Sequence, residues 1–171
     1  MVTTINGATA KNFFRSCAPK NQCNVTGSSS FPGGTLQMAS TCCTVENRCT
    51  PNEPQFASPA TNNTWANGIV CRQCQTINSD RCDTQNSTVC YGNESMCIRL
   101  STITSGYPQE ESVLAFRGCA TRSVCDMNQQ LFKTSGLSTV YNYICTSAAT
   151  GLHYGSIILL TFFVFILNVT S

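Results

Sequence analysis

The sequence predicts a small, all-β, disulfide-rich fold, and three observations carry this prediction. The chain has 13 cysteines in 171 residues, more than a reducing compartment tolerates unless metals bind the thiols. Its apolar residues fall into short β-branched and aromatic runs, which favour strands. Outside the C-terminal tail, no stretch has the i, i+3, i+4, i+7 spacing of an amphipathic helix.

Disulfides and zinc are the two explanations for so many cysteines. Structural zinc sites use paired C-x2-C knuckles or Cys/His sets, whereas this chain has one such pair, Cys71/Cys74, and one histidine, His153. Zinc is therefore the weaker explanation. A redox role for Cys71/Cys74 is weaker still, because that motif opens a helix in a βαβ setting. Four N-x-[ST] sequons independently favour an oxidising, extracellular compartment: Asn24, Asn62, Asn86 and Asn93.

Composition also excludes several functions. Charged residues make up 11% of the chain and the formal net charge is +2, so neither nucleic acid nor an acidic membrane surface is expected as a partner. No pair of residues suggests acid–base catalysis, and the cysteines have a structural role. We therefore expect neither an enzyme nor a cofactor.

An internal repeat organises the chain. The segment Phe14-Arg-Ser-Cys-Ala18 recurs 102 positions later as Phe116-Arg-Gly-Cys-Ala120, and the following cysteines keep similar spacings. Five cysteines precede the second copy, but only sixteen residues precede Cys17. We therefore expect the first unit to lack its N-terminal half, which explains both the odd cysteine count and the absence of a signal peptide. A deliberate free thiol at Cys17 is the alternative. Phe14 and Phe116 are expected at a shared core or strand position.

Strands are expected in three places in the second unit. Met96, Ile98, Leu100 and Ile103 approximate a period of two, residues 113–116 form a β-prone run, and 139–144 form another. Turn residues at 105–108 separate the first two runs. Residues rich in Pro, Asn, Ser and Thr between Cys49 and Cys71 are typical of a linker.

The C-terminal tail resembles a glycolipid-anchor signal. Residues 157–167 are eleven nearly unbroken apolar residues, about half of what a membrane-spanning helix needs. No Lys or Arg follows them, and small residues beginning at Ser147 precede a short polar spacer. We therefore expect an anchor at Ser147, with a short span or a buried strand as alternatives.

The cysteine pattern of the second unit resembles the urokinase-receptor/Ly-6 three-finger domain family. The resemblance rests on Cys71-Arg-Gln-Cys74 and on Cys82, Cys90, Cys97, Gly118-Cys119, Cys125 and Cys145. The first unit resembles the distal half of the same domain, because its Cys42-Cys43 and Cys49 are similar to the family's double-cysteine ending. In the second unit Cys145 stands alone, and Asn67-Gly68 precedes Cys71. Both features resemble the two-domain phospholipase A2 inhibitor gamma group.

This resemblance implies a fold, a domain division and a disulfide pattern. The fold would be one partial and one near-complete three-finger domain: residues 1–50 and 68–147, with a linker over 51–67 and the anchor signal over 148–171. Cys17 would be left unpaired. The implied pairs are Cys71–Cys97, Cys74–Cys82, Cys90–Cys119, Cys125–Cys145, Cys23–Cys42 and Cys43–Cys49.

The expected function is recognition of an extracellular protein. Tyr107, Glu110 and Glu111 would lie at the tip of the central finger, where an exposed aromatic could anchor a partner; a solvated loop is the plainer alternative. Trp65 could pack between the domains or face a ligand. The resemblance implies a secreted phospholipase A2 as the bound and inhibited partner. The alternative function is a glycolipid-anchored cell-surface receptor or adhesion protein.

Overall fold

A computed structural model gives the structure of the chain over residues 1–15, 17–43, 50–56, 65–107, 111–134 and 136–147. The predicted fold class is confirmed: the protein is all-β, disulfide-rich and of the three-finger type. Within these residues, no helix has the length and apolar character needed to span a bilayer.

The second unit contains three hairpin-like fingers. The first finger runs from β5 through β6 to β7, and β5 pairs with β7. The second finger is the β8–β9 hairpin, and the third is the β10–β11 hairpin, which joins the second through β8 and β11. The one-turn helix α1 links β9 to β10. The bounds are β5 Ala66–Arg72, β6 Cys74–Ile77, β7 Ser87–Tyr91, β8 Met96–Gly106, β9 Ser112–Ala120, α1 Arg122–Cys125, β10 Gln129–Thr134 and β11 Leu137–Ser147.

The first unit repeats the strand order of the second and third fingers. Its strands pair in the order β2-β1-β4-β3, which matches β9-β8-β11-β10 of the second unit. The short helix η1 stands where α1 stands in the second unit. The bounds are β1 Val2–Ile5, β2 Ala8–Lys11, η1 Lys20–Gln22, β3 Thr26–Phe31 and β4 Gly34–Ala39. The sequence repeat therefore corresponds to a repeated topology.

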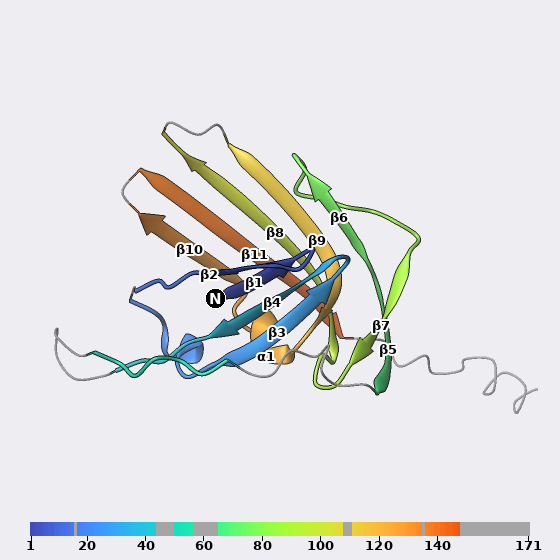
Figure 1. Cartoon of the computed structure of the whole chain (residues 1–171), viewed down its shortest axis with the longest axis horizontal. Helices are drawn as coiled ribbons and strands as arrows, with labels where there is room; N and C mark the ends of the chain where they lie inside the picture. The colour runs from blue at the N-terminus through green and yellow to red at the C-terminus, as the bar shows by residue number, and fades with distance from the viewer. Residues whose placement is uncertain (16, 44–49, 57–64, 108–110, 135, 148–171) are drawn as a thin grey trace, which may run out of the picture.

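The two units share one sheet because β9 pairs with strands from both. Residues 114–117 of β9 pair with β6, whereas Cys119 and Ala120 pair with Ser30 and Ser29 of β3. The backbones approach closely at this junction, because a Cβ on Gly118 would overlap the carbonyl oxygen of Ser30. Figure 1 shows β1–β4 lying across the sheet formed by β8–β11.

The main core lies between the two units. Alternate residues of β8 point into it, namely Met96, Ile98 and Leu100, as the period-two pattern predicts. The first unit contributes Leu36 and Met38 from β4 to the same cluster. The Tyr143 hydroxyl lies 3.4 Å from Met38 Sδ. Burial raises the pKa of Tyr143 well above its ordinary value, with a smaller contribution from neighbouring Tyr141.

The structure corrects three sequence-based expectations. Phe116 is buried in the core. Phe14, in contrast, lies outside the strands, is 40% exposed and packs against Phe132 of β10, with tilted rings whose centroids are 4.3 Å apart. The shared motif therefore does not give the two rings a shared core or strand position. Trp65 is 67% exposed, so it is not packed between the units. Strand β5 begins at Ala66, inside the expected linker.

Candidate protein-binding site

Disulfides hold the bases of the fingers together. Five bonds join described cysteines to one another, and each is a pair that the family resemblance implies: Cys23–Cys42, Cys71–Cys97, Cys74–Cys82, Cys90–Cys119 and Cys125–Cys145. Cys43 is also disulfide-bonded, and Cys49 lies outside the described residues. Cys17 is exposed and forms no disulfide with any described residue.

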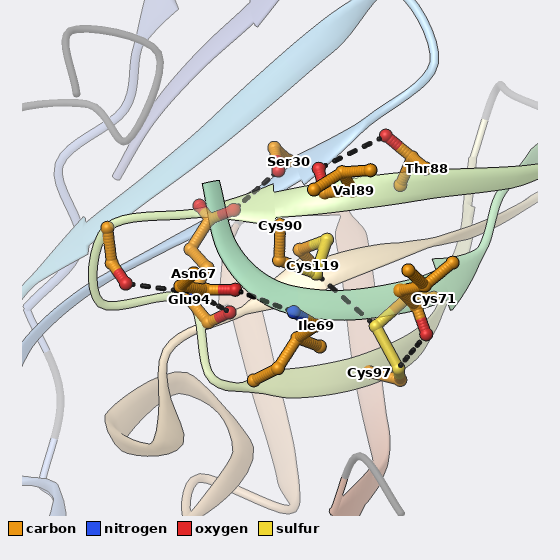
Figure 2. The surroundings of a disulfide bond; sticks show 12 residues. Ser30, Asn67, Ile69, Cys71, Thr88, Val89, Cys90, Glu94, Cys97 and Cys119 are labelled. Carbon is orange, nitrogen blue, oxygen red and sulfur yellow. Dashed lines mark hydrogen bonds between the residues drawn. A yellow bond between two sulfur atoms is a disulfide. The ribbon is translucent and has the colours of Figure 1, made fainter. Parts of the chain in front are cut away.

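Two of these disulfides form a buried sulfur cluster beneath β7. The sulfur atoms of Cys71 and Cys90 lie 3.4 Å apart, and Cys119 lies beside them with no exposed surface. Figure 2 shows Cys90 pointing from β7 toward Cys119. Three cysteines at this spacing could suggest a metal site, but their sulfurs are in disulfides and offer no thiolate. The cluster therefore has a structural role: its two disulfides link the first finger covalently to the second.

The tip of the second finger presents an exposed aromatic residue. Strand β8 has eleven residues, and Tyr107 immediately follows it with 91% of its surface exposed. Glu111, at the other side of the tip, is also exposed. Glu110 lies outside the described residues. The structure thus places Tyr107 and Glu111 at the end of the central finger.

Two glycines fix this tip against the third finger. Gly106 pairs with Leu137 across β8 and β11, and a Cβ at Gly106 would overlap the carbonyl oxygen of Gly136. Gly136 has φ +90°, a conformation that L side chains rarely adopt. The backbone that carries Tyr107 is therefore supported on one side by the β10–β11 turn.

The ion pairs between described residues lie elsewhere than at this tip. Two ion pairs join described residues, Lys11–Glu53 at 3.1 Å and Arg117–Asp83 at 3.0 Å, and neither involves Tyr107 or Glu111. Asp83 is 73% exposed, so solvent screens its pair with Arg117. The exposed Tyr107 ring and the exposed Glu111 are both available to a partner at the tip.

A buried carboxylate joins the two units. Glu94, in the turn between β7 and β8, is 1% exposed. Its carboxylate accepts hydrogen bonds from the hydroxyls of Ser28 at 2.8 Å and Ser30 at 2.5 Å. Burial raises the pKa of Glu94, and the two hydroxyls oppose that shift. The sequence did not predict this contact, because its partners are 64 and 66 residues away.

Asn67 stabilises the turn that carries Glu94 through side-chain hydrogen bonds. Its side-chain amide donates to the backbone oxygens of Gly92 and Glu94, at 2.9 and 3.1 Å. Its side-chain oxygen accepts from the amide of Ile69 at 3.1 Å. Figure 2 shows Asn67 beside Glu94, with Ser30 of the first unit reaching toward the carboxylate. The Asn67-Gly68 dipeptide entered the sequence analysis only through the family resemblance, so the contact of Asn67 with this turn was not predicted.

Two open clefts lie near the junction in the part of the chain that the structure describes. The larger, of about 600 Å³, is lined by β6, the polar loop between β6 and β7, and Pro32. The smaller, of about 390 Å³, lies between β7 and the first unit and is lined by both apolar and hydroxyl-bearing side chains. Neither lining includes Tyr107 or Glu111.

The remaining predicted residues that the structure describes lie apart from the fingertip. Asn24, Asn86 and Asn93 are exposed, and Asn62 lies outside the described residues. Ser147 is the exposed last residue of β11 and pairs with Met96, at the opposite end of the sheet from Tyr107. The anchor-like tail and His153 fall within residues 148–171, outside the described residues.

Comparison with known proteins gives two similar sequences. The chain is 28% identical over 136 residues to the phospholipase A2 inhibitor NAI of Notechis ater. It is 26% identical over 136 residues to a phospholipase A2 inhibitor of the gamma type from Laticauda semifasciata. Each match covers 78% of this chain. The match spans 65% of the first relative, less than two thirds of its length, and 72% of the second. No family model and no solved structure matches the chain.

Proposed function

We propose that the chain is an extracellular protein-binding module of the urokinase-receptor/Ly-6 type, which binds and inhibits a secreted phospholipase A2. Both similar proteins are named as inhibitors of that enzyme, which supports the choice of ligand and a role other than catalysis. The disulfide-linked frame supports a role in recognition, because a preordered surface loses little conformational entropy on binding.

The observation that carries this proposal is the exposure of Tyr107. Its ring is 91% exposed at the end of an eleven-residue strand, while the base of that strand is tied to the first finger by Cys71–Cys97. Aromatic residues of this kind are common binding hot spots because they bury a large area with few rotatable bonds. Tyr107 is thus the preferred anchor for the partner.

A binding measurement with the oxidised full chain tests the proposal. A secreted phospholipase A2 is immobilised, and the Kd of the native chain is compared with that of Tyr107→Ala. Loss of a hot-spot side chain costs about 2 kcal/mol or more, which corresponds to about a 30-fold weaker Kd. Enzyme activity on phospholipid vesicles should fall as the native chain is added, and the variant should inhibit correspondingly less.

The control is Ile144→Ala in the third finger. Ile144 is also exposed, at 50%, but it pairs with Arg99 in the basal half of β8, whereas Tyr107 follows the other end of that strand. Its substitution should leave Kd unchanged. Equal affinity of the native chain and Tyr107→Ala would remove the fingertip from the interface, and no binding to any secreted phospholipase A2 would refute the choice of ligand.

The second candidate function is a glycolipid-anchored surface receptor for a protein ligand. The apolar run at 157–167 and the small residues from Ser147 favour it. Ser147 pairs with Met96 at one end of β8, whereas Tyr107 follows Gly106 at the other. Eleven strand residues span about 35 Å, so an anchor at Ser147 would hold the fingertip away from the membrane. Release from cells by a phosphatidylinositol-specific phospholipase C would favour this function, and constitutive secretion the inhibitor.

A further inference from the structure

The outward face of the first finger is apolar. Val70 and Val89 lie opposite each other across β5 and β7 and are 58% and 41% exposed. Tyr91, two residues further along β7, is 40% exposed. Cys90, between Val89 and Tyr91, points to the opposite side and is buried. Contiguous exposed apolar groups of this kind commonly mark a surface that something covers.

The smaller cleft lies between this apolar face and the first unit. Val89 and Tyr91 line it on one side, and Phe31 of the first unit lines it on the other, within about 390 Å³. Hydroxyl-bearing residues complete the lining, and no charged side chain is among them: Thr4, Ser30, Thr35 and Thr88. Aromatic rings with neutral hydroxyls suit a sugar, whose C–H face packs on a ring while its hydroxyls exchange hydrogen bonds.

A glycan attachment point lies next to this cleft. Asn93 is exposed and follows Tyr91 by two residues, in the turn that leaves β7. Its neighbour in the sequon, Glu94, is buried against Ser28 and Ser30, and Asn67 holds the backbone on both sides of Asn93. Unlike a sugar on a free loop, a sugar on Asn93 would therefore start from a fixed backbone.

We propose that Asn93 carries an N-linked glycan whose inner sugars fold back over β7 and occupy the cleft between Tyr91 and Phe31. In the attachment step, Nδ2 of Asn93 forms a bond to the anomeric carbon of the first sugar and gives up one proton. The bond from that carbon to the polyprenyl diphosphate of the oligosaccharide donor breaks, and the diphosphate leaves with the electron pair. The inference rests on the extracellular location in the proposed function, but not on the identity of the ligand.

Hydroxyl-radical footprinting tests this inference on the full chain, expressed in mammalian cells behind a cleavable secretion signal. Ser95→Ala removes the Asn93 sequon, and Thr26→Ala, the matched control, removes the Asn24 sequon; both hydroxyl residues are exposed. Oxidation of Tyr91 and Val89 should rise several-fold in Ser95→Ala and stay unchanged in Thr26→Ala. Tyr107, which lines neither cleft, serves as the internal reference and should be oxidised equally in all three proteins.

Failure of this inference can be distinguished from failure of the proposed function. Unmodified Asn93 alongside glycosylated Asn24 or Asn86 would overturn the inference and leave the function standing. Glycosylated Asn93 with equal oxidation of Tyr91 in the native chain and Ser95→Ala would also overturn it, because the glycan would then extend into solvent. A secreted chain with no glycan on any sequon and with free thiols in the second unit would refute both.

Discussion

The Ser30 hydroxyl donates a part-buried hydrogen bond of 2.5 Å to the Glu94 carboxylate. It joins the two units of the chain, although the two residues are 64 positions apart in sequence. Ser28 donates to the same carboxylate, and β3, which carries both serines, also pairs with the end of β9. A buried charge is tolerated only where hydrogen bonds replace its water. This contact therefore makes the relative position of the units specific.

Three consecutive serines of β3 should respond differently to substitution. Ser28→Ala and Ser30→Ala each remove a donor to a buried carboxylate, so each should lower the free energy of unfolding by about 1–3 kcal/mol. The Ser29 hydroxyl is buried and has no hydrogen-bond partner among the described residues. Ser29→Ala should therefore be neutral or stabilising, because it removes a hydroxyl without leaving a partner unsatisfied. Guanidinium unfolding with intact disulfides measures all three.

Ser29→Ala is the matched control in this series, since it changes the same atoms in the same strand. A loss of stability in Ser29→Ala as large as that in its neighbours would show that packing of the serine side chains, and not the carboxylate contact, dominates at β3.

The Glu94 contact should also make stability depend on pH. Because the pKa of Glu94 in the folded protein is raised above its ordinary value of 4.5, the folded state takes up a proton before the unfolded state does. The contribution of Glu94 to stability is therefore full below pH 4.5 and is lost as the pH rises through the folded pKa. Relative to Glu94→Gln, the native chain should gain stability as the pH falls from neutral toward 4.5.

Parallel guanidinium unfolding series of the native chain and Glu94→Gln measure this difference, because the other titrating groups are common to both proteins. A constant difference in unfolding free energy across the pH range would contradict the prediction. A difference that grew in favour of the native chain toward neutral pH would reverse its sign and point to a lowered pKa.

The sequence predicted the strands of the second finger and β11 because their signals are local, but it did not predict β5, β6, β7 or β10 as strands. The period-two pattern of Met96, Ile98 and Leu100 identified the buried face of β8, and the turn residues after it identified the tip. The disulfide pairs came from the family resemblance, since spacing alone allows many connectivities. The Phe-Arg-x-Cys-Ala repeat predicted two related units, and the strand orders β3-β4-β1-β2 and β10-β11-β8-β9 are alike.

The junction could not be predicted, because its determinants are not local. Nothing near Glu94 in the sequence indicates that its partners are Ser28 and Ser30, and a Glu in a sequon is normally expected to be solvated. Phe14 illustrates the same limit. It shares a motif with Phe116, but the rings have different surroundings because Phe116 packs on Phe31 and Phe14 on Phe132. Tertiary contacts thus override the local repeat.

Gly118 should be among the least replaceable residues of β9. A Cβ there would overlap the backbone oxygen of Ser30, so Gly118→Ala must push the first unit away from β9. Overpacking of this kind costs about 1–3 kcal/mol, and separation of the units would add the loss of the Glu94 contact. Ser112→Ala, at the exposed start of the same strand, should change stability by no more than about 0.5 kcal/mol.

Unfolding curves and hydrogen exchange of β3 measure the effect of Gly118→Ala. Faster exchange at β3 with normal exchange at β10 would show that the junction opens while the third finger stays folded. Native-like stability and exchange in Gly118→Ala would mean that the two backbones are farther apart in solution than the junction requires.

Disulfides should differ in their contribution to stability according to loop length and burial. Cys90–Cys119 closes a separation of 29 residues and both sulfurs are buried, whereas Cys74–Cys82 closes only 8 residues. The chain-entropy model gives the longer loop an advantage of about 1 kcal/mol. The paired substitution Cys90→Ala/Cys119→Ala also leaves a cavity in the buried cluster, which adds to its cost.

The paired substitution Cys74→Ala/Cys82→Ala is therefore the matched comparison, since it removes the same set of atoms, but both of its cysteines lie within the first finger. Unfolding free energies from guanidinium titration should rank the Cys90/Cys119 variant below the Cys74/Cys82 variant by more than about 1 kcal/mol. The reverse ranking would indicate that the polar loop between β6 and β7, and not the buried cluster, limits the stability of the first finger. Because Cys90–Cys119 ties that finger to β9, its loss should also weaken the Glu94 contact, and the pH dependence described above should diminish in that variant alone.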